Sequence, residues 1–88
     1  MIKILYFSAP WCGPCKQLSP IMDEIKLTHS DKVQIEKIDV DSNPEMSMKY
    51  NVSSIPTLVY LRNDVVISRT SGFIPKNEII KNIDFLNK

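Results

Sequence analysis

Two cysteines, Cys12 and Cys15, are the residues whose type and spacing point most directly to chemistry. They lie within Trp11-Cys12-Gly13-Pro14-Cys15-Lys16, after an apolar stretch and at the start of a predicted helix. A bridge between them closes a very small loop, and the stabilisation that a disulfide gives falls with loop size. The pair therefore indicates redox chemistry, which is the usual meaning of C-x-x-C in a β-α-β setting.

The helix start gives the two sulfurs different roles. Cys12 is expected at the helix N-terminus, where free N–H groups and the helix dipole favour a thiolate. Cys15 follows one turn later on the same face, so its sulfur can reach Cys12. We expect Cys12 to attack a substrate disulfide and Cys15 to resolve the mixed disulfide. Gly13 permits close approach of a substrate backbone, and Pro14 fixes the turn.

The cysteine pair has two other interpretations. A structural zinc site needs four ligands, but no second pair is present and His29 is the single histidine, so no metal is expected. An inert buried pair fits poorly, because the flanking glycine, proline and tryptophan are typical of a surface turn.

Apolar periodicity supplies the elements that position this motif. Apolar, β-prone stretches predict strands over residues 2–7, 33–40, 57–61 and 65–69. Helical spacing and start signals predict helices over residues 14–27, 44–51 and 75–86. Pro20 is expected to kink the first helix, Asn43 to cap the second, and Met48 to fill the core. The order is β-α-β-α-β-β-α, an α/β arrangement.

Length and charge limit the range of functions. The 88 residues predict a single domain over 1–88, and 11 basic against 10 acidic side chains give a net charge of +1 without like-charge blocks. Nucleic-acid and membrane partners are therefore not expected. The apolar run Ile4–Phe7 is too short for a secretory signal or a membrane span. A monomeric cytoplasmic protein is expected.

The motif at residues 11–16 resembles the active site of the thioredoxin family without a change. A second matching element is Ser54-Ile55-Pro56-Thr57, and the resemblance implies a cis Pro56 beside the dithiol. The likeness covers nearly the whole chain; further matches are Pro20, Asp23-Glu24-Ile25, Lys37, Asp41, Asn43-Pro44, Tyr50 and Gly72. It implies a minimal thioredoxin-like fold, with a central four-stranded mixed sheet flanked by three helices.

The resemblance also implies a substrate-binding surface. Trp11, Ile55, Pro56 and Gly72 are expected to form a flat apolar rim around an exposed Cys12 sulfur. The backbone groups of Ile55 would pair with an extended substrate segment. The alternative is that these residues only pack the core or shape turns.

The chain departs from the family at three places. The chain starts at the strand before the dithiol, so the usual first strand and helix are expected to be absent, as in glutaredoxins and small thioredoxin-like proteins of archaea and phages. This plan leaves one sheet edge more exposed. Asp64 stands at a hairpin position where the family has glycine, and Asn63-Asp64 still tolerates a left-handed turn.

The third departure is Tyr6, which occupies the position of the family's buried aspartate. That carboxylate is thought to take the proton of the second cysteine and to partner the lysine matched by Lys37. One hypothesis is that Lys37 assists Cys15 while the Tyr6 hydroxyl or a water relays the proton. The other is that Lys37 extends to solvent and Tyr6 fills the core.

The sequence has three functional interpretations. The resemblance implies a protein-disulfide reductase that binds no cofactor, carries a redox-active Cys12–Cys15 disulfide, and is recycled by an NADPH-dependent flavoprotein reductase. A glutathione-dependent glutaredoxin fits the short length. However, glutaredoxins usually have a tyrosine in the dithiol motif, and a glycine pair plus aspartate near the position of Gly72, where this chain has Phe73-Ile74. The third reading is a non-catalytic binding subunit that uses the same surface.

Overall fold

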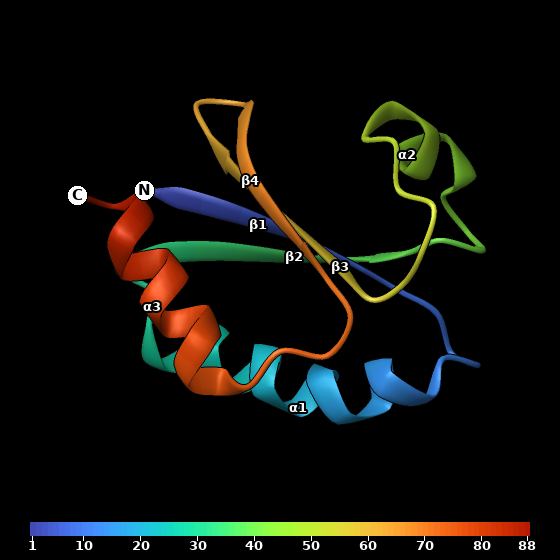
Figure 1. Ribbon diagram of the computed structural model, residues 1–88, viewed down its shortest axis with the longest axis horizontal. Coiled ribbons are helices and arrows are strands. Elements are labelled where there is room, and N and C mark those ends of the chain that lie inside the picture. The colour runs from blue at the N-terminus through green and yellow to red at the C-terminus, as the bar shows by residue number, and fades with distance from the viewer.

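The computed structural model describes residues 1–88 and contains one sheet and three helices (Figure 1). The elements are β1 (Ile2–Ser8), α1 (Gly13–Thr28), β2 (Val33–Asp39), α2 (Pro44–Lys49), β3 (Thr57–Arg62), β4 (Val65–Ser71) and α3 (Lys76–Leu86). The predicted order and the α/β fold class are confirmed, and element ends differ from the prediction by at most two residues.

The strands lie in the order β2-β1-β3-β4, so the strand that leads into the dithiol is central. β1 pairs in parallel with β2 and antiparallel with β3, and β3 pairs antiparallel with β4. Central position explains why β1 is buried along nearly its whole length. β2 and β4 are the edges, and β4 has no buried residue. Asn63 and Asp64 turn the hairpin with φ of 51° and 66°, as expected.

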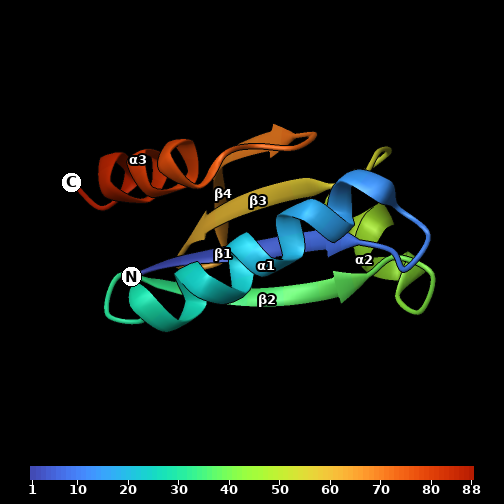
Figure 2. The same ribbon diagram turned by 90° about the horizontal axis from the view of Figure 1, so that it is seen from below.

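Alternation along β1 divides the core between the two faces of the sheet. Ile2, Ile4 and Tyr6 belong to the larger cluster, which α1 and α3 cover. Leu5 and Phe7 belong to a smaller cluster on the opposite face, beside α2. Figures 1 and 2 show α1 and α3 on one side of the sheet and α2 on the other.

The parallel register carries polar residues onto the face beneath α1. Tyr6 lies opposite Lys37, and Ser8 lies opposite Asp39. Residues two apart on a strand share a face, so all four side chains lie on the α1 side, at the carboxyl ends of β1 and β2. These are the ends nearest the start of α1, and they therefore surround the dithiol.

The structure bears on three local predictions, for Pro20, Asn43 and Met48. α1 continues through Pro20 as one helix from Gly13 to Thr28. The prediction that the Asn43 side chain caps α2 is wrong; its amide donates instead to the Asp39 carbonyl oxygen at 3.1 Å. The prediction that Met48 fills the core is also wrong, since 81% of it is exposed. α2 has only six residues, so one side of it covers the sheet and Met48 lies on the other.

Candidate active site

Cys12 and Cys15 form a disulfide at the N-terminus of α1. Cys12 is the N-cap residue with extended backbone, and its sulfur accepts a hydrogen bond from the Cys15 N–H at 3.3 Å. Pro14 stands in the first turn, where its missing N–H costs no helical bond. The Cα atoms of the two cysteines are 5.2 Å apart. The predicted position of the pair, one turn apart at a helix start, is confirmed.

The expectation of an exposed Cys12 sulfur is wrong for this disulfide form. Only 5% of the surface of Cys12 and 2% of the surface of Cys15 are exposed to solvent. The reason is that the pair packs with Ala9 and with the half-buried side chains of Val40 and Ile55. The part of Cys12 that solvent can reach in the disulfide form is therefore small. Beside it the surface is open, because a Cβ added to Gly13 would meet no atom within 4 Å.

Trp11 lies beside the dithiol and is 67% exposed. Its indole nitrogen donates to Asp41 Oδ2 at 2.8 Å, which fixes the ring at the surface. Trp11 and Ile55 line an open groove of about 220 Å³; the other lining residues are Val40, Ser47, Val52, Ser53 and Ser54. The two sequence motifs contain Trp11, Ser54 and Ile55. The groove's remaining walls come from Val40 just after β2, from α2 and from the loop after α2, and they carry no sequence signal.

The loop before β3 supplies the opposite side of the site. The Ile55–Pro56 peptide bond is cis, as the resemblance implied. Pro56 is itself buried, so it supports the surface while Ile55 and Gly72 reach it. Gly72 has φ of 84°, which favours glycine, and its N–H donates to the Pro56 carbonyl oxygen at 2.8 Å. Neither the N–H nor the C=O of Ile55 has a backbone partner, so both are free to pair with an added strand.

Tyr6 is buried beneath the first turns of α1. Its hydroxyl donates to the Cys15 carbonyl oxygen at 3.0 Å and is hydrogen-bonded to Ser19 Oγ at 2.9 Å. Burial raises the pKa of Tyr6 above its ordinary value of 10.0, and the hydrogen bond with Ser19 offsets part of this shift. The hydroxyl is therefore neutral at physiological pH and is bonded to the backbone of Cys15 and to Ser19.

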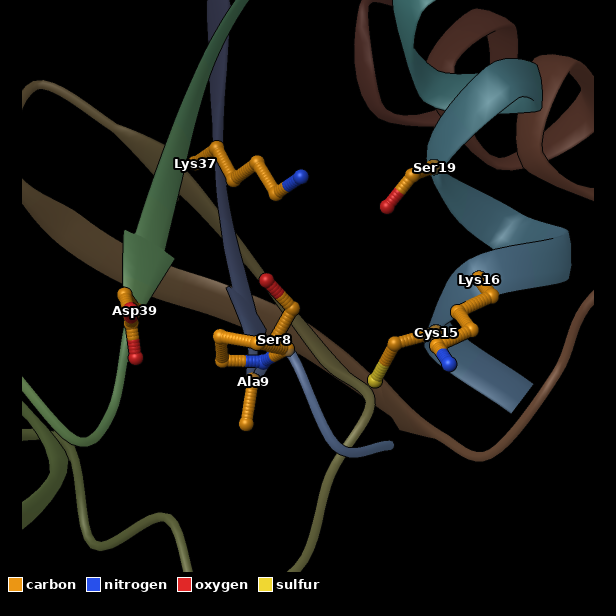
Figure 3. A pocket seen from close by; sticks show the side chains of 8 residues that line it. Ser8, Ala9, Cys15, Lys16, Ser19, Lys37 and Asp39 are labelled. Carbon is orange, nitrogen blue, oxygen red and sulfur yellow. The ribbon is translucent and has the colours of Figure 1, made fainter. Parts of the chain in front are cut away.

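A cavity of about 410 Å³ that opens to solvent lies behind Cys15, between α1 and the ends of β1 and β2, with charged and hydroxyl side chains on its walls. It is lined by Ser8, Ala9, Pro10, Cys15, Lys16, Ser19, Lys37 and Asp39. Figure 3 shows the Cys15 sulfur pointing from α1 into this space and Lys37 extending into it from β2. Lys37 Nζ lies 6.0 Å from the centre of the Tyr6 ring and forms no ion pair. Sequence reasoning missed Ser8, Ser19 and Asp39 here, because three separate elements bring them together.

The structure contains neither a metal-binding cluster nor a membrane-spanning helix. No group of three histidine, cysteine, aspartate or glutamate side chains is arranged to hold a metal ion. None of the three helices combines the length and apolar character needed to cross a membrane.

Known proteins are similar to this chain in sequence over most of its length. The protein-family model described as Thioredoxin matches residues 2–85. A thioredoxin of Bacillus subtilis (strain 168) is 48% identical over 73 residues, which make up 83% of this chain and 70% of that protein. A thioredoxin of Staphylococcus epidermidis (strain ATCC 12228) is 39% identical over 83 residues, which make up 94% and 80% of the two chains.

Two solved structures share the fold. A mutant thioredoxin from Halobacterium salinarum NRC-1 has a TM-score of 0.92 at 26% identity, covering 99% of this chain and 75% of that one. A malarial protein has a TM-score of 0.88 at 30% identity, covering 97% and 96%. Together with the cysteine pair at the start of α1, these matches confirm the resemblance: the chain belongs to the thioredoxin family, whose chemistry is thiol–disulfide exchange.

Proposed function

We propose that this protein reduces disulfide bonds in other proteins by dithiol exchange, with Cys12 as nucleophile and Cys15 as resolving thiol. The observation that supports this most directly is the Cys12 sulfur at the N-terminus of α1, accepting the Cys15 N–H. When the pair is reduced, that N–H and the helix dipole stabilise a negative charge on the sulfur. A thiolate is the nucleophile that disulfide exchange requires.

The reaction has two exchange steps. The Cys12 thiolate attacks one substrate sulfur, the substrate disulfide breaks, and one substrate thiolate leaves while a mixed disulfide forms. Cys15 then loses its proton and attacks the Cys12 sulfur, so the second substrate thiolate leaves. Two electrons pass from the dithiol to the substrate, and the Cys12–Cys15 disulfide seen here is the oxidised product.

Substrate recognition is assigned to the rim formed by Trp11, Ile55 and Gly72, supported by Pro56. The free backbone groups of Ile55 favour an extended substrate segment bound as an added strand. The open surface at Gly13 leaves room for the substrate backbone beside Cys12. The groove beside Trp11 would take an apolar side chain near the substrate cysteine.

For the proton of Cys15, we assign Lys37 an assisting role and Tyr6 a positioning role. The Tyr6 hydroxyl is bonded to the Cys15 carbonyl oxygen, so it holds the first turn of α1 rather than relaying a proton from the sulfur. Lys37 extends into the cavity that Cys15 lines. In this proposal, Lys37→Met slows resolution of a mixed disulfide and Tyr6→Phe changes it little. Unchanged rates in both variants would remove these residues from the mechanism.

The partners follow from the same chemistry. The oxidised protein must be reduced again, and the family resemblance points to a flavoprotein reductase that uses NADPH, with glutathione as the alternative donor. No bound cofactor is required, because the cysteine pair itself carries the electrons. A cytoplasmic, monomeric protein fits this role, since the cytoplasm keeps thiols reduced.

Trapping tests the proposed function. A Cys15→Ser protein can form the mixed disulfide but cannot resolve it, so it should accumulate a covalent adduct with a disulfide-containing protein. A Cys12→Ser protein, the matched control, should form none. Peptide mapping that finds no adduct on Cys12 would contradict the proposal. Recycling by reductase and NADPH, or by glutathione, distinguishes the two donors.

The binding-subunit reading needs a separate test. If a protein with both Cys12→Ser and Cys15→Ser still performs the biological role, the dithiol chemistry is not what that role depends on. Loss of the role in a double variant that remains folded supports the reductase.

A further inference from the structure

The cavity behind Cys15 is open to solvent, because Pro10, Lys16 and Lys37 among its lining residues are exposed. Of its eight lining residues only two are hydrophobic, and the polar ones come from β1, α1 and β2. Its volume of about 410 Å³ is far more than the roughly 10–15 Å³ that a cavity needs to hold one water. Hydroxyls of Ser8 and Ser19 lie on its walls with the charged groups, so water entering it finds hydrogen-bond partners.

The charged side chains around this cavity come from α1 and β2. Lys16 comes from α1, and Lys37 and Asp39 come from β2. From β1, Tyr6 faces the same region, but burial raises its pKa and keeps it neutral. Asp39 is the one carboxylate among the lining residues. It forms no ion pair, and its Oδ1 accepts the backbone N–H of Asp41 at 2.9 Å.

The resolving step needs a thiolate on Cys15. No carboxylate stands at the position of Tyr6, and the Tyr6 hydroxyl is already committed to the Cys15 carbonyl oxygen. The Cys15 side chain lines the cavity, so its proton can pass to water there and then to solvent. Charges across a small hydrated space still act on such a thiol, since like charge disfavours the thiolate and opposite charge favours it.

We propose that this cavity is a hydrated exit for the Cys15 proton, in which Lys37 favours the Cys15 thiolate and Asp39 opposes it. Asp39 is thus a positioning residue that acts through the field on Cys15 and touches no reacting atom. The proposal rests on the dithiol mechanism above and adds a determinant of its resolving step. In that step the Cys15 proton goes to cavity water, the thiolate bonds to Cys12, the Cys12–substrate bond breaks, and the departing thiolate takes a proton from solvent.

The experiment distinguishes the reactions of the two thiols by the time at which each occurs. Reduced protein is mixed in a single turnover with a small aromatic disulfide whose released thiolate is coloured. The first release of colour reports Cys12, and the second reports attack by Cys15. The pH dependence of the second rate is measured for the unsubstituted protein, Asp39→Asn, Lys37→Met and the double variant. Glu36→Gln is the matched control, because Glu36 lies on the same strand but belongs to the opposite face, paired with Lys3 at 3.4 Å.

The expected shifts have opposite signs. Asp39→Asn should move the midpoint of the second rate about half a pH unit lower, and Lys37→Met about half a unit higher, less than the roughly one to three units of a charge in direct contact. Below the midpoint, half a unit is about a threefold change in rate. The double variant should return toward the unsubstituted protein, and Glu36→Gln should not move the midpoint.

Other outcomes separate this inference from the proposed function. Unmoved midpoints in both variants, or shifts of the same sign, would overturn the role of the cavity while leaving the dithiol mechanism intact. Absence of the first colour release in the unsubstituted protein would instead overturn the dithiol mechanism itself.

Discussion

The surroundings of the two cysteines carry different kinds of side chain although the residues are one helical turn apart. On the Cys12 side lie the exposed ring of Trp11, the half-buried Ile55 and a groove with apolar walls. On the Cys15 side lies an open cavity with lysines, serines and one aspartate on its walls. The difference suggests a division of tasks. In our proposal, apolar contact and free backbone groups serve recognition at Cys12, while water and charge serve proton movement at Cys15.

The largest effect is expected from Cys12→Ser, because this change removes the nucleophile. Protein-disulfide reduction should fall by more than about a thousandfold, as when an enzyme's nucleophile is deleted. The measurement is the rate of substrate reduction with excess reductant. Retention of substantial activity would contradict the roles assigned to the two cysteines, since Cys15 would then be attacking substrate in place of Cys12.

Trp11→Ala tests the recognition side. Loss of an exposed aromatic anchor should raise KM for a protein substrate about tenfold, equivalent to about 1–2 kcal/mol, and should affect a small aromatic disulfide far less. Phe85→Ala is the matched control, because Phe85 is 70% exposed but lies on α3. Equal losses with the large and the small substrate would mean that Trp11 holds the dithiol instead of the substrate.

Tyr6→Phe tests the packing beneath Cys15. Losing the hydrogen bond to the Cys15 carbonyl oxygen should lower the free energy of unfolding by about 1 kcal/mol. Denaturant unfolding measures this value. Tyr50→Phe is the control, since Tyr50 lies on the opposite face and its hydroxyl has no hydrogen-bond partner. A larger loss in the Tyr50 variant would contradict the assigned anchoring contact.

The same tyrosine predicts an alkaline limit to stability. Burial raises the pKa of Tyr6 and Tyr60 above 10.0, so above that pH the folded state holds protons that the unfolded state has lost. This contribution is fully present below about pH 10 and is lost as pH rises through the higher folded-state pKa. Unfolding free energy measured from about pH 9 upward should fall less steeply in Tyr6→Phe. An unchanged slope would show that Tyr6 does not contribute.

The smallest effect is expected from Asp41→Asn. The amide oxygen can still accept from the Trp11 indole, but the bond loses its charge, so KM for a protein substrate should rise about twofold at most. A rise as large as that of Trp11→Ala would mean that Asp41 itself contacts substrate.

Much of this arrangement could be predicted from short-range signals. The apolar, β-prone run over residues 2–7, the helical spacing after Pro14 and the left-handed tolerance at Asn63-Asp64 depend on neighbours in the chain, and the structure confirms each. The position of Cys12 at a helix start followed from the same reasoning.

What could not be predicted depends on contacts between distant segments. Cys12 is covered because Val40 and Ile55 pack against it from two other parts of the chain. Asp39 reaches the site only through its pairing with Ser8 across two strands. The exposure of Met48 reflects which side of a short helix meets the sheet, which the helical spacing of the sequence leaves open.

The most direct test is a titration of the Cys12 thiol. It measures the alkylation rate of the reduced Cys15→Ser variant as a function of pH. A sulfur held at the start of α1 should react as a thiolate with a midpoint below about 8, against about 8.5 for an ordinary free cysteine. A midpoint at or above the ordinary value, or no reaction with alkylating agent at all, would contradict the proposed role of Cys12.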